Sequence, residues 1–168
     1  MSERRLTDYP SPPDTNSLWV WTRDSDPLRV TFNFFMLLIV RYSPSLRLKI
    51  VAMRLMGVKV GEKVSMGLDA TVDIFNPELI TIGDNTIIGY NATILAHEYL
   101  IDRKRTGQVV IGRNVLIGAN ATVLAGVTIG DGACVSACSL VNADVPAGAF
   151  VGGVPARVLE TRAIERQQ

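Results

Sequence analysis

A six-residue repeat runs from Val60 to Pro146 and constrains the fold more than any other feature of the chain. Twelve hexads can be written, and in seven of them the apolar first residue is followed by glycine, as in Ile88-Gly89. The fifth position is small or β-branched in ten hexads, and only Asn76 and Glu98 break this rule. The hexads start at Val60, Met66, Val72, Ile82, Ile88, Ile94, Ile111, Ile117, Val123, Ile129, Val135 and Val141.

This period predicts an all-β solenoid. One inward apolar residue and one small residue in every six suit a triangular coil of three short strands, which stacks on the next coil about 4.8 Å away. We expect the glycines to serve corners that require a permissive φ angle. Each coil exposes hydrophobic faces above and below, so the coils stabilise one another and the ends need covers.

The repeat divides the chain into three parts. Residues 57–152 form the predicted solenoid, residues 1–56 an N-terminal tail and helical cap, and residues 153–168 a closing segment. Two interruptions break the phase, at 78–81 and at 100–110. The second is predicted to be an extruded loop. Loops are where solenoids usually carry function. Its four consecutive charged residues, 102–105, predict either a solvated tip or a functional lid or intersubunit arm.

The apolar segment Val30–Val40 has about half of the ~20 residues that a membrane-spanning helix requires. It predicts a buried helix over the first coil, followed after Pro44 by an amphipathic helix at Leu46–Met56. Trp19 and Trp21 are expected to seat this cap. Interfacial membrane contact through residues 30–40 is the alternative.

Composition narrows the classes of partner. The chain has 168 residues, 48% of them hydrophobic, and a net charge of +1, which fits one compact domain. Its basic residues are scattered and balanced by acids, so no nucleic-acid partner is predicted. The polar, proline-containing start at residues 1–14 argues against a cleavable signal and makes cytoplasmic location the expectation.

The two cysteines predict neither a disulfide nor a metal site. Cys134 and Cys138 lie four residues apart, which in an extended chain is too far for a disulfide. Without histidine or further cysteine nearby they cannot complete a zinc shell. We expect reduced packing residues and no metal.

His97 is the only histidine and lies at the root of the longer interruption. Counting along the coils places Asn76 and Glu98 at the seventeenth positions of neighbouring coils, so they are expected to stack beside it. Broken local rules tend to mark functional sites. A free imidazole has a pKa near 6.5 and can accept a proton from an attacking hydroxyl, so His97 is predicted to be a general base. Glu98 either joins this site or pairs with a loop arginine.

From Val58 to Leu159 the chain resembles the hexapeptide-repeat acyltransferases, whose fold is a left-handed parallel β-helix, and especially the maltose, galactoside and nodulation-type O-acetyltransferases. The resemblance implies direct acetyl transfer from acetyl-coenzyme A to a hydroxyl of a sugar or other small acceptor, in a homotrimer with sites between chains. His97 matches the catalytic base of these enzymes. Asn76 matches an asparagine that helps form their acceptor pocket, and Glu98 lies beside it.

The resemblance also implies coenzyme contacts. Ala119 and Ala137 fall at matching edge positions, and Asn142 stands where a nucleotide contact is common. The closing sequence Gly152–Arg157, reading GGVPAR, matches the family's Gly-x-Pro-Ala-Arg/Lys pattern and places Arg157 at a coenzyme phosphate.

Three positions depart from the family pattern. Leu116 replaces a tryptophan that commonly lines the acceptor pocket, Asn142-Ala143 replaces a Thr-Lys pair, and Glu160 replaces a second basic residue. The resemblance therefore does not identify the acceptor, and we expect either a lower affinity for the coenzyme or a different position of its nucleotide.

The same residues argue against two other enzymatic functions. A β-helix carbonic anhydrase needs three histidines for zinc, and this chain has one. A covalent acyl-enzyme needs a nucleophile beside the base, whereas both cysteines fall more than a coil from His97. The remaining alternative is a non-catalytic β-helix used for assembly or binding, in which His97 only shapes a subunit contact.

Overall fold

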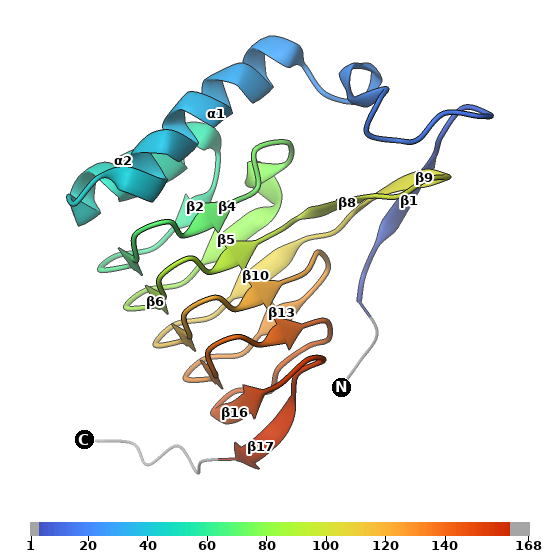
Figure 1. Ribbon diagram of the computed structural model, residues 1–168. Helices are drawn as coiled ribbons and strands as arrows, with labels where there is room; N and C mark the ends of the chain where they lie inside the picture. Colours follow the sequence, from blue (N-terminus) through green and yellow to red (C-terminus); the bar gives the residue numbers. More distant parts are fainter. Residues whose placement is uncertain (1–3, 162–168) are drawn as a thin grey trace.

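Three parallel sheets wind into a solenoid in the computed structural model, which describes residues 4–161 (Figure 1). One sheet holds β2 (Lys59–Val60), β5 (Ile80–Ile82), β10 (Val109–Ile111) and β13 (Thr128–Ile129). The next holds β3 (Ser65–Met66), β6 (Ile87–Ile88), β11 (Leu116–Ile117), β14 (Cys134–Val135) and β16 (Ala149–Gly152), which pairs antiparallel with β17 (Arg157–Thr161). The third holds β4 (Thr71–Val72), β7 (Thr93–Ile94), β12 (Thr122–Val123) and β15 (Leu140–Val141).

The hexad residues build the core as predicted. Val72 pairs with Ile94 and Val123 with Val141, so the first residue of each hexad lies above its counterpart in the next coil. These side chains are almost entirely buried along the solenoid axis. Fifth-position residues such as Ala92 and Ala121 are also fully buried. The small or β-branched rule therefore reflects lack of space inside the coil.

The predicted reason for the hexad glycines was wrong. Left-handed φ angles occur at the fourth position of the hexad instead, as at Asn91 (φ 52°) and Asn120 (φ 58°). At the second position the constraint is the neighbouring coil: a Cβ atom on Gly118 would lie 2.4 Å from the backbone nitrogen of Ala137. Glycine is selected there because only a hydrogen fits between coils.

Two antiparallel helices cover the first coil (Figure 1). Helix α1 is Pro27–Tyr42, longer than the predicted 30–40, because Asp26 caps its N-terminus by accepting from Leu28 N at 2.9 Å and proline stands at the first position. Helix α2 is Leu46–Met56, as predicted, and ends at Gly57 with φ 106°. Only one face of α1 is buried, through Val30, Asn33, Leu37 and Val40.

The longer interruption is an arm with regular structure. Strand β8 (His97–Tyr99) turns into β9 (Arg103–Thr106), and the N-terminal β1 (Thr7–Pro10) pairs with β9 to complete an antiparallel sheet. The predicted solvated tip at 102–105 was therefore wrong for Lys104, which is 3% exposed. Pairing with a strand almost a hundred residues away overrode the local charge signal. The shorter interruption holds the 3₁₀ turn η2 (Pro77–Leu79).

Two smaller predictions need correction. Trp19 and Trp21 were expected to seat the cap, but Trp19 is 81% exposed. Trp21 lies in the 3₁₀ turn η1 (Trp21–Arg23) and packs edge-on against Phe75, in the loop after β4, with ring centroids 5.6 Å apart. Both cysteines are free as predicted, but Cys138 is exposed at a corner with φ 57°. It is not a packing residue.

Candidate active site

His97 is held by a buried aspartate from the preceding coil. Its Nδ1 lies 2.5 Å from Asp73 Oδ2, and the two side chains are 14% and 0% exposed. Asp73 follows β4, and His97 begins β8 one coil further on. The stacking of coils therefore creates the pair, although 24 residues separate its members.

The carboxylate of Asp73 is fully engaged. Its Oδ1 accepts from the backbone N–H of Phe75 at 2.8 Å and of Asn76 at 3.0 Å, and Oδ2 accepts from Ala96 N at 2.8 Å. Burial acts to raise the pKa of Asp73, but the hydrogen bond and charge of His97 and the backbone donors outweigh it and hold the pKa below its usual range. Asp73 is therefore ionised at neutral pH.

This pairing fixes the chemistry of the imidazole. An ionised carboxylate can only accept, so His97 donates through Nδ1–H and keeps a free lone pair on Nε2. The arrangement orients the ring and stabilises the imidazolium that forms when Nε2 takes a proton, as in other carboxylate–histidine pairs. The site can therefore supply a general base.

Aromatic rings enclose the imidazole. Phe75 lies edge-on to His97 with centroids 4.9 Å apart, and Tyr99 does so at 4.8 Å. On the facing strand β9, Lys104 Nζ lies 5.5 Å from the centroid of the Tyr99 ring. Burial raises the pKa of Tyr99 to about 12 and lowers that of Lys104 despite the nearby acids. His97 is therefore largely buried, with aromatic rings beside it and the Asp73 carboxylate at Nδ1.

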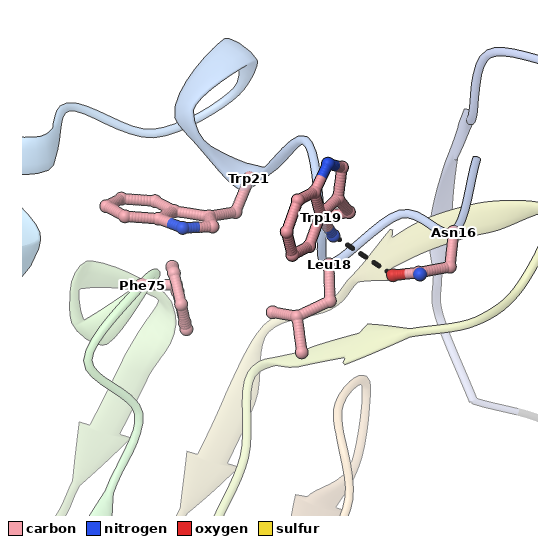
Figure 2. Close-up of a pocket in the computed structure, with 5 residues that line it drawn as sticks. All are labelled: Asn16, Leu18, Trp19, Trp21 and Phe75. Atoms are coloured by element: carbon pink, nitrogen blue, oxygen red, sulfur yellow. Dashed lines mark hydrogen bonds between the residues drawn. The ribbon is translucent and has the colours of Figure 1, made fainter.

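Two cavities adjoin this cluster. One of about 540 Å³ is lined by Trp19, Trp21, Leu18, Asn16 and Phe75. Figure 2 shows the Trp21 ring facing Phe75, with Trp19 and Leu18 beside them and Asn16 accepting from Trp19 N at 3.0 Å. A second cavity, of about 320 Å³, is more polar, and its lining includes Tyr9, Asp24, Asn76, Glu78, Leu79, Lys104 and Thr106.

The predicted acceptor residues have separate environments. Asn76 lines the polar cavity, and its buried Oδ1 has no hydrogen-bond partner among the described residues. That atom is a candidate acceptor for a ligand hydroxyl. Glu98 forms an ion pair with Arg4 of the N-terminal segment, not with an arginine of the arm. The side chain of Asn76 donates to Glu78 at 3.4 Å, whereas that of Glu98 pairs with Arg4.

Three of the four predicted coenzyme residues lie on another edge of the coil. Ala119 and Ala137 stack in successive coils, with Cys138 N donating to Ala119 O at 2.8 Å. Arg157 is exposed and lies opposite Gly152 in the pairing of β16 with β17. Gly152 lies against Ser136, the residue before Ala137. Ala119 precedes β12, whereas His97 follows β7, so one chain places these groups on different edges. Asn142 follows β15, on the His97 edge, and its Oδ1 is buried without a partner among the described residues.

Sequence reasoning missed Asp73, Phe75 and Trp21 as site residues. A signal for Asp73 was present, because it occupies the second position of its hexad, where most hexads have glycine, in the coil directly before His97. Within residues 4–161 no group of three or more His, Cys, Asp or Glu side chains could hold a metal ion.

Family models and known proteins agree with this architecture. The family described as "Bacterial transferase hexapeptide (six repeats)" matches residues 108–143, and "Hexapeptide repeat of succinyl-transferase" matches 79–94. The Bacillus subtilis (strain 168) protein "Putative acetyltransferase YvoF" is 50% identical over 159 residues, spanning 94% of this chain and 92% of that protein. The Staphylococcus aureus (strain MSSA476) protein "Putative acetyltransferase SAS0727" is 44% identical over 142 residues, spanning 84% of this chain and 88% of that one.

Solved structures give the same picture. The hexapeptide-repeat acetyltransferase VCA0836 of Vibrio cholerae, complexed with acetyl-coenzyme A, superposes with a TM-score of 0.63 at 25% identity, over 80% of this chain and 86% of that one. A galactoside acetyltransferase in complex with coenzyme A has the same fold, with a TM-score of 0.63 at 22% identity, over 80% of this chain and 81% of that one. The chain belongs to the hexapeptide-repeat acetyltransferase family.

Proposed function

We propose that the protein transfers an acetyl group from acetyl-coenzyme A directly to a hydroxyl of a sugar or other small acceptor, with His97 as general base. The observation that carries this proposal is the buried Asp73–His97 pair beside two cavities. The bound acetyl-coenzyme A of the Vibrio cholerae relative supports the donor. The left-handed winding typical of the family is part of the same proposal.

In the proposed step, Nε2 of His97 takes the proton of the acceptor hydroxyl as its oxygen attacks the thioester carbonyl carbon. The carbon–sulfur bond breaks, and the leaving thiolate receives the proton from the imidazolium, which gives an acetyl ester and free coenzyme A. Asp73 stabilises the positive ring during this cycle. The aromatic rings around His97 exclude water, which favours the acceptor over hydrolysis.

The aromatic cavity supports a sugar-like acceptor. Flat rings such as Trp19 and Trp21 offer stacking surfaces, while Asn76 Oδ1 in the neighbouring cavity offers a hydrogen-bond acceptor to a hydroxyl. Leu116 is 42% exposed and lies on β11, in a different sheet from the strands beside His97.

We also propose a homotrimer with each site between two chains. The support is the separation of His97 from the Ala119–Ala137 column and Arg157, because a base on one edge can meet a coenzyme on another edge only across a subunit boundary. Mixing His97→Ala, which lacks the base, with Arg157→Ala, which is weakened for acetyl-coenzyme A, tests this arrangement at coenzyme concentrations below the KM of the wild type. Random mixed trimers should regain activity in about a quarter of their sites. No regain on mixing would refute a shared site.

The proposed reaction is tested by thiol release from acetyl-coenzyme A with a panel of sugars, amino sugars and alcohols. We expect acceptor-dependent release by the wild type and none above background by His97→Ala, whose fold is checked by circular dichroism. Arg113→Gln, at an exposed corner outside the site, should retain full activity. No release with any acceptor and no coenzyme binding by calorimetry would instead support the non-catalytic assembly function.

A further inference from the structure

The outer face of helix α1 is apolar and uncovered. Leu28, Phe32, Phe35 and Tyr42 lie opposite the buried side of the helix and are 82%, 38%, 56% and 58% exposed. They recur at helical spacing along the full length of α1. The helix lies over the end of the solenoid, so this side of it is turned away from the coils (Figure 1). An amphipathic helix packed only on the first coil would carry polar residues there.

Helix α2 continues this surface. Leu48, Val51 and Leu55 are 47%, 51% and 53% exposed and follow one another at intervals of three and four residues. Arg29 of α1 donates to the carbonyl of Leu55 at 3.1 Å, which joins the start of α1 to the end of α2. We call the combined surface the cap face, made of Leu28, Phe32, Phe35, Tyr42, Leu48, Val51 and Leu55. A contiguous apolar surface of this kind marks a contact site.

The charged residues of the cap helices all have one sign, although Arg41 and Arg54 pair with Asp69 and Glu62 of the first coil. From Pro27 to Met56 the sequence contains five basic residues and no acidic residue. Lys49 points inward, with Nζ donating to Met66 O at 3.1 Å and Gly67 O at 2.8 Å, whereas Arg47 is exposed and forms no ion pair among the described residues. A second copy of the cap face would bring like charges together, and an anionic surface would not.

We propose that the cap face docks on an anionic lipid surface. The apolar side chains would enter the boundary between headgroups and acyl chains, with Arg47 at the rim facing lipid phosphates. No helix within residues 4–161 is long and apolar enough to cross a membrane.

The trimer proposed above would strengthen this contact. Subunits that associate through the sides of parallel solenoids present their three caps at the same end, so docking is multivalent. The arm of β8 and β9 projects from the side of the solenoid and not from the outer face of the helices (Figure 1). The protein would thus meet acceptors located at a lipid surface.

Co-sedimentation of the full chain with vesicles tests the proposal. One set of vesicles contains equal parts phosphatidylglycerol and phosphatidylcholine, and the other phosphatidylcholine alone. We expect binding to the anionic vesicles that weakens in high salt, and much less binding to the neutral ones. The double variant Leu28→Gln/Phe35→Gln should bind at least about tenfold more weakly. Ile101→Gln, at the 80% exposed tip of the arm, is the matched control and should bind like the wild type.

Two further measurements keep the outcomes distinct. Arg47→Glu leaves the apolar side chains in place and should weaken binding to anionic vesicles several-fold, which guards against a double variant that fails to fold. Light scattering without lipid should give the same mass for the wild type and the double variant. Unchanged vesicle binding by the double variant, or none by the wild type, overturns the proposal. A smaller mass for the double variant would identify a second copy as the occupant.

Discussion

Replacing Asp73 with asparagine tests how the candidate base is positioned. The carboxylate accepts four hydrogen bonds, one from His97 Nδ1 at 2.5 Å and three from the backbone N–H groups of Ala96, Phe75 and Asn76 at 2.8–3.0 Å. A carboxamide has only one accepting oxygen. Because two backbone donors face Oδ1, the amide oxygen should stay on that side, and the new NH₂ group should face Ala96 and His97.

The imidazole can answer this change only by changing tautomer. His97 would then accept at Nδ1 and carry its proton on Nε2, where the acceptor hydroxyl must be deprotonated. Loss of one hydrogen bond to a charged group is worth about 1.5–3 kcal/mol, or about 10- to 150-fold in rate. The wrong tautomer in serine proteases lowers kcat by about 10⁴-fold. We therefore expect Asp73→Asn to lower kcat by about 10²- to 10⁴-fold.

Stability should fall as well, by a smaller and separable amount. The Ala96 N–H would face another donor while buried, which costs about 1–3 kcal/mol and lowers Tm by several degrees. Steady-state thiol release gives kcat and the KM for acetyl-coenzyme A, which should change little. Asp131→Asn, another corner aspartate that accepts a backbone N–H at 2.8 Å, is the matched control. A normal kcat with a lowered Tm would show that Asp73 is only structural and refute the reasoning.

Three further predictions concern pH, stability and coenzyme affinity. The pKa of Asp73 is lower in the folded state, so its contribution to stability is full above pH about 4 and is lost as the pH falls through the folded-state pKa. The Tm of the wild type should therefore fall more steeply with decreasing pH than the Tm of Asp73→Asn. Cys138→Asn relieves a left-handed residue at φ 57° in the column of Asn91 and Asn120 and should raise Tm by about 2–4 °C in calorimetry, whereas Cys138→Ala should not. Arg157→Gln should raise the KM for acetyl-coenzyme A about tenfold and leave kcat near that of the wild type.

The solenoid was predictable because its rules are local and repeated. Each hexad supplies one buried apolar residue, so the pairing of Val72 with Ile94 follows from counting along the coil. The same count places His97 at the root of the arm. The cause assigned to the glycines was wrong because a one-dimensional pattern cannot distinguish a required φ angle from a close approach between coils, such as that of Gly118 to Ala137.

The rest of the site depends on contacts between distant segments. Strand β1 pairs with β9, and Asp8 lies opposite Arg105, yet nothing in the polar N-terminal sequence indicates a strand. The burial of Lys104 follows from that pairing. In register with Val72 and Ile94, Asp73 lies level with Leu95, so its contact with His97 depends on how the chain turns into the arm. Residue spacing alone therefore predicted His97 as the candidate base but not the carboxylate that contacts it.

The most direct test of the account is mass spectrometry of protein and small molecules after incubation with acetyl-coenzyme A and an acceptor that supports thiol release. Direct transfer with His97 as base predicts equal amounts of acetylated acceptor and free coenzyme A from the wild type, no product from His97→Ala, and an unchanged protein mass without acceptor. An acetylated protein that forms before the acceptor is added, or normal product from His97→Ala, would contradict it.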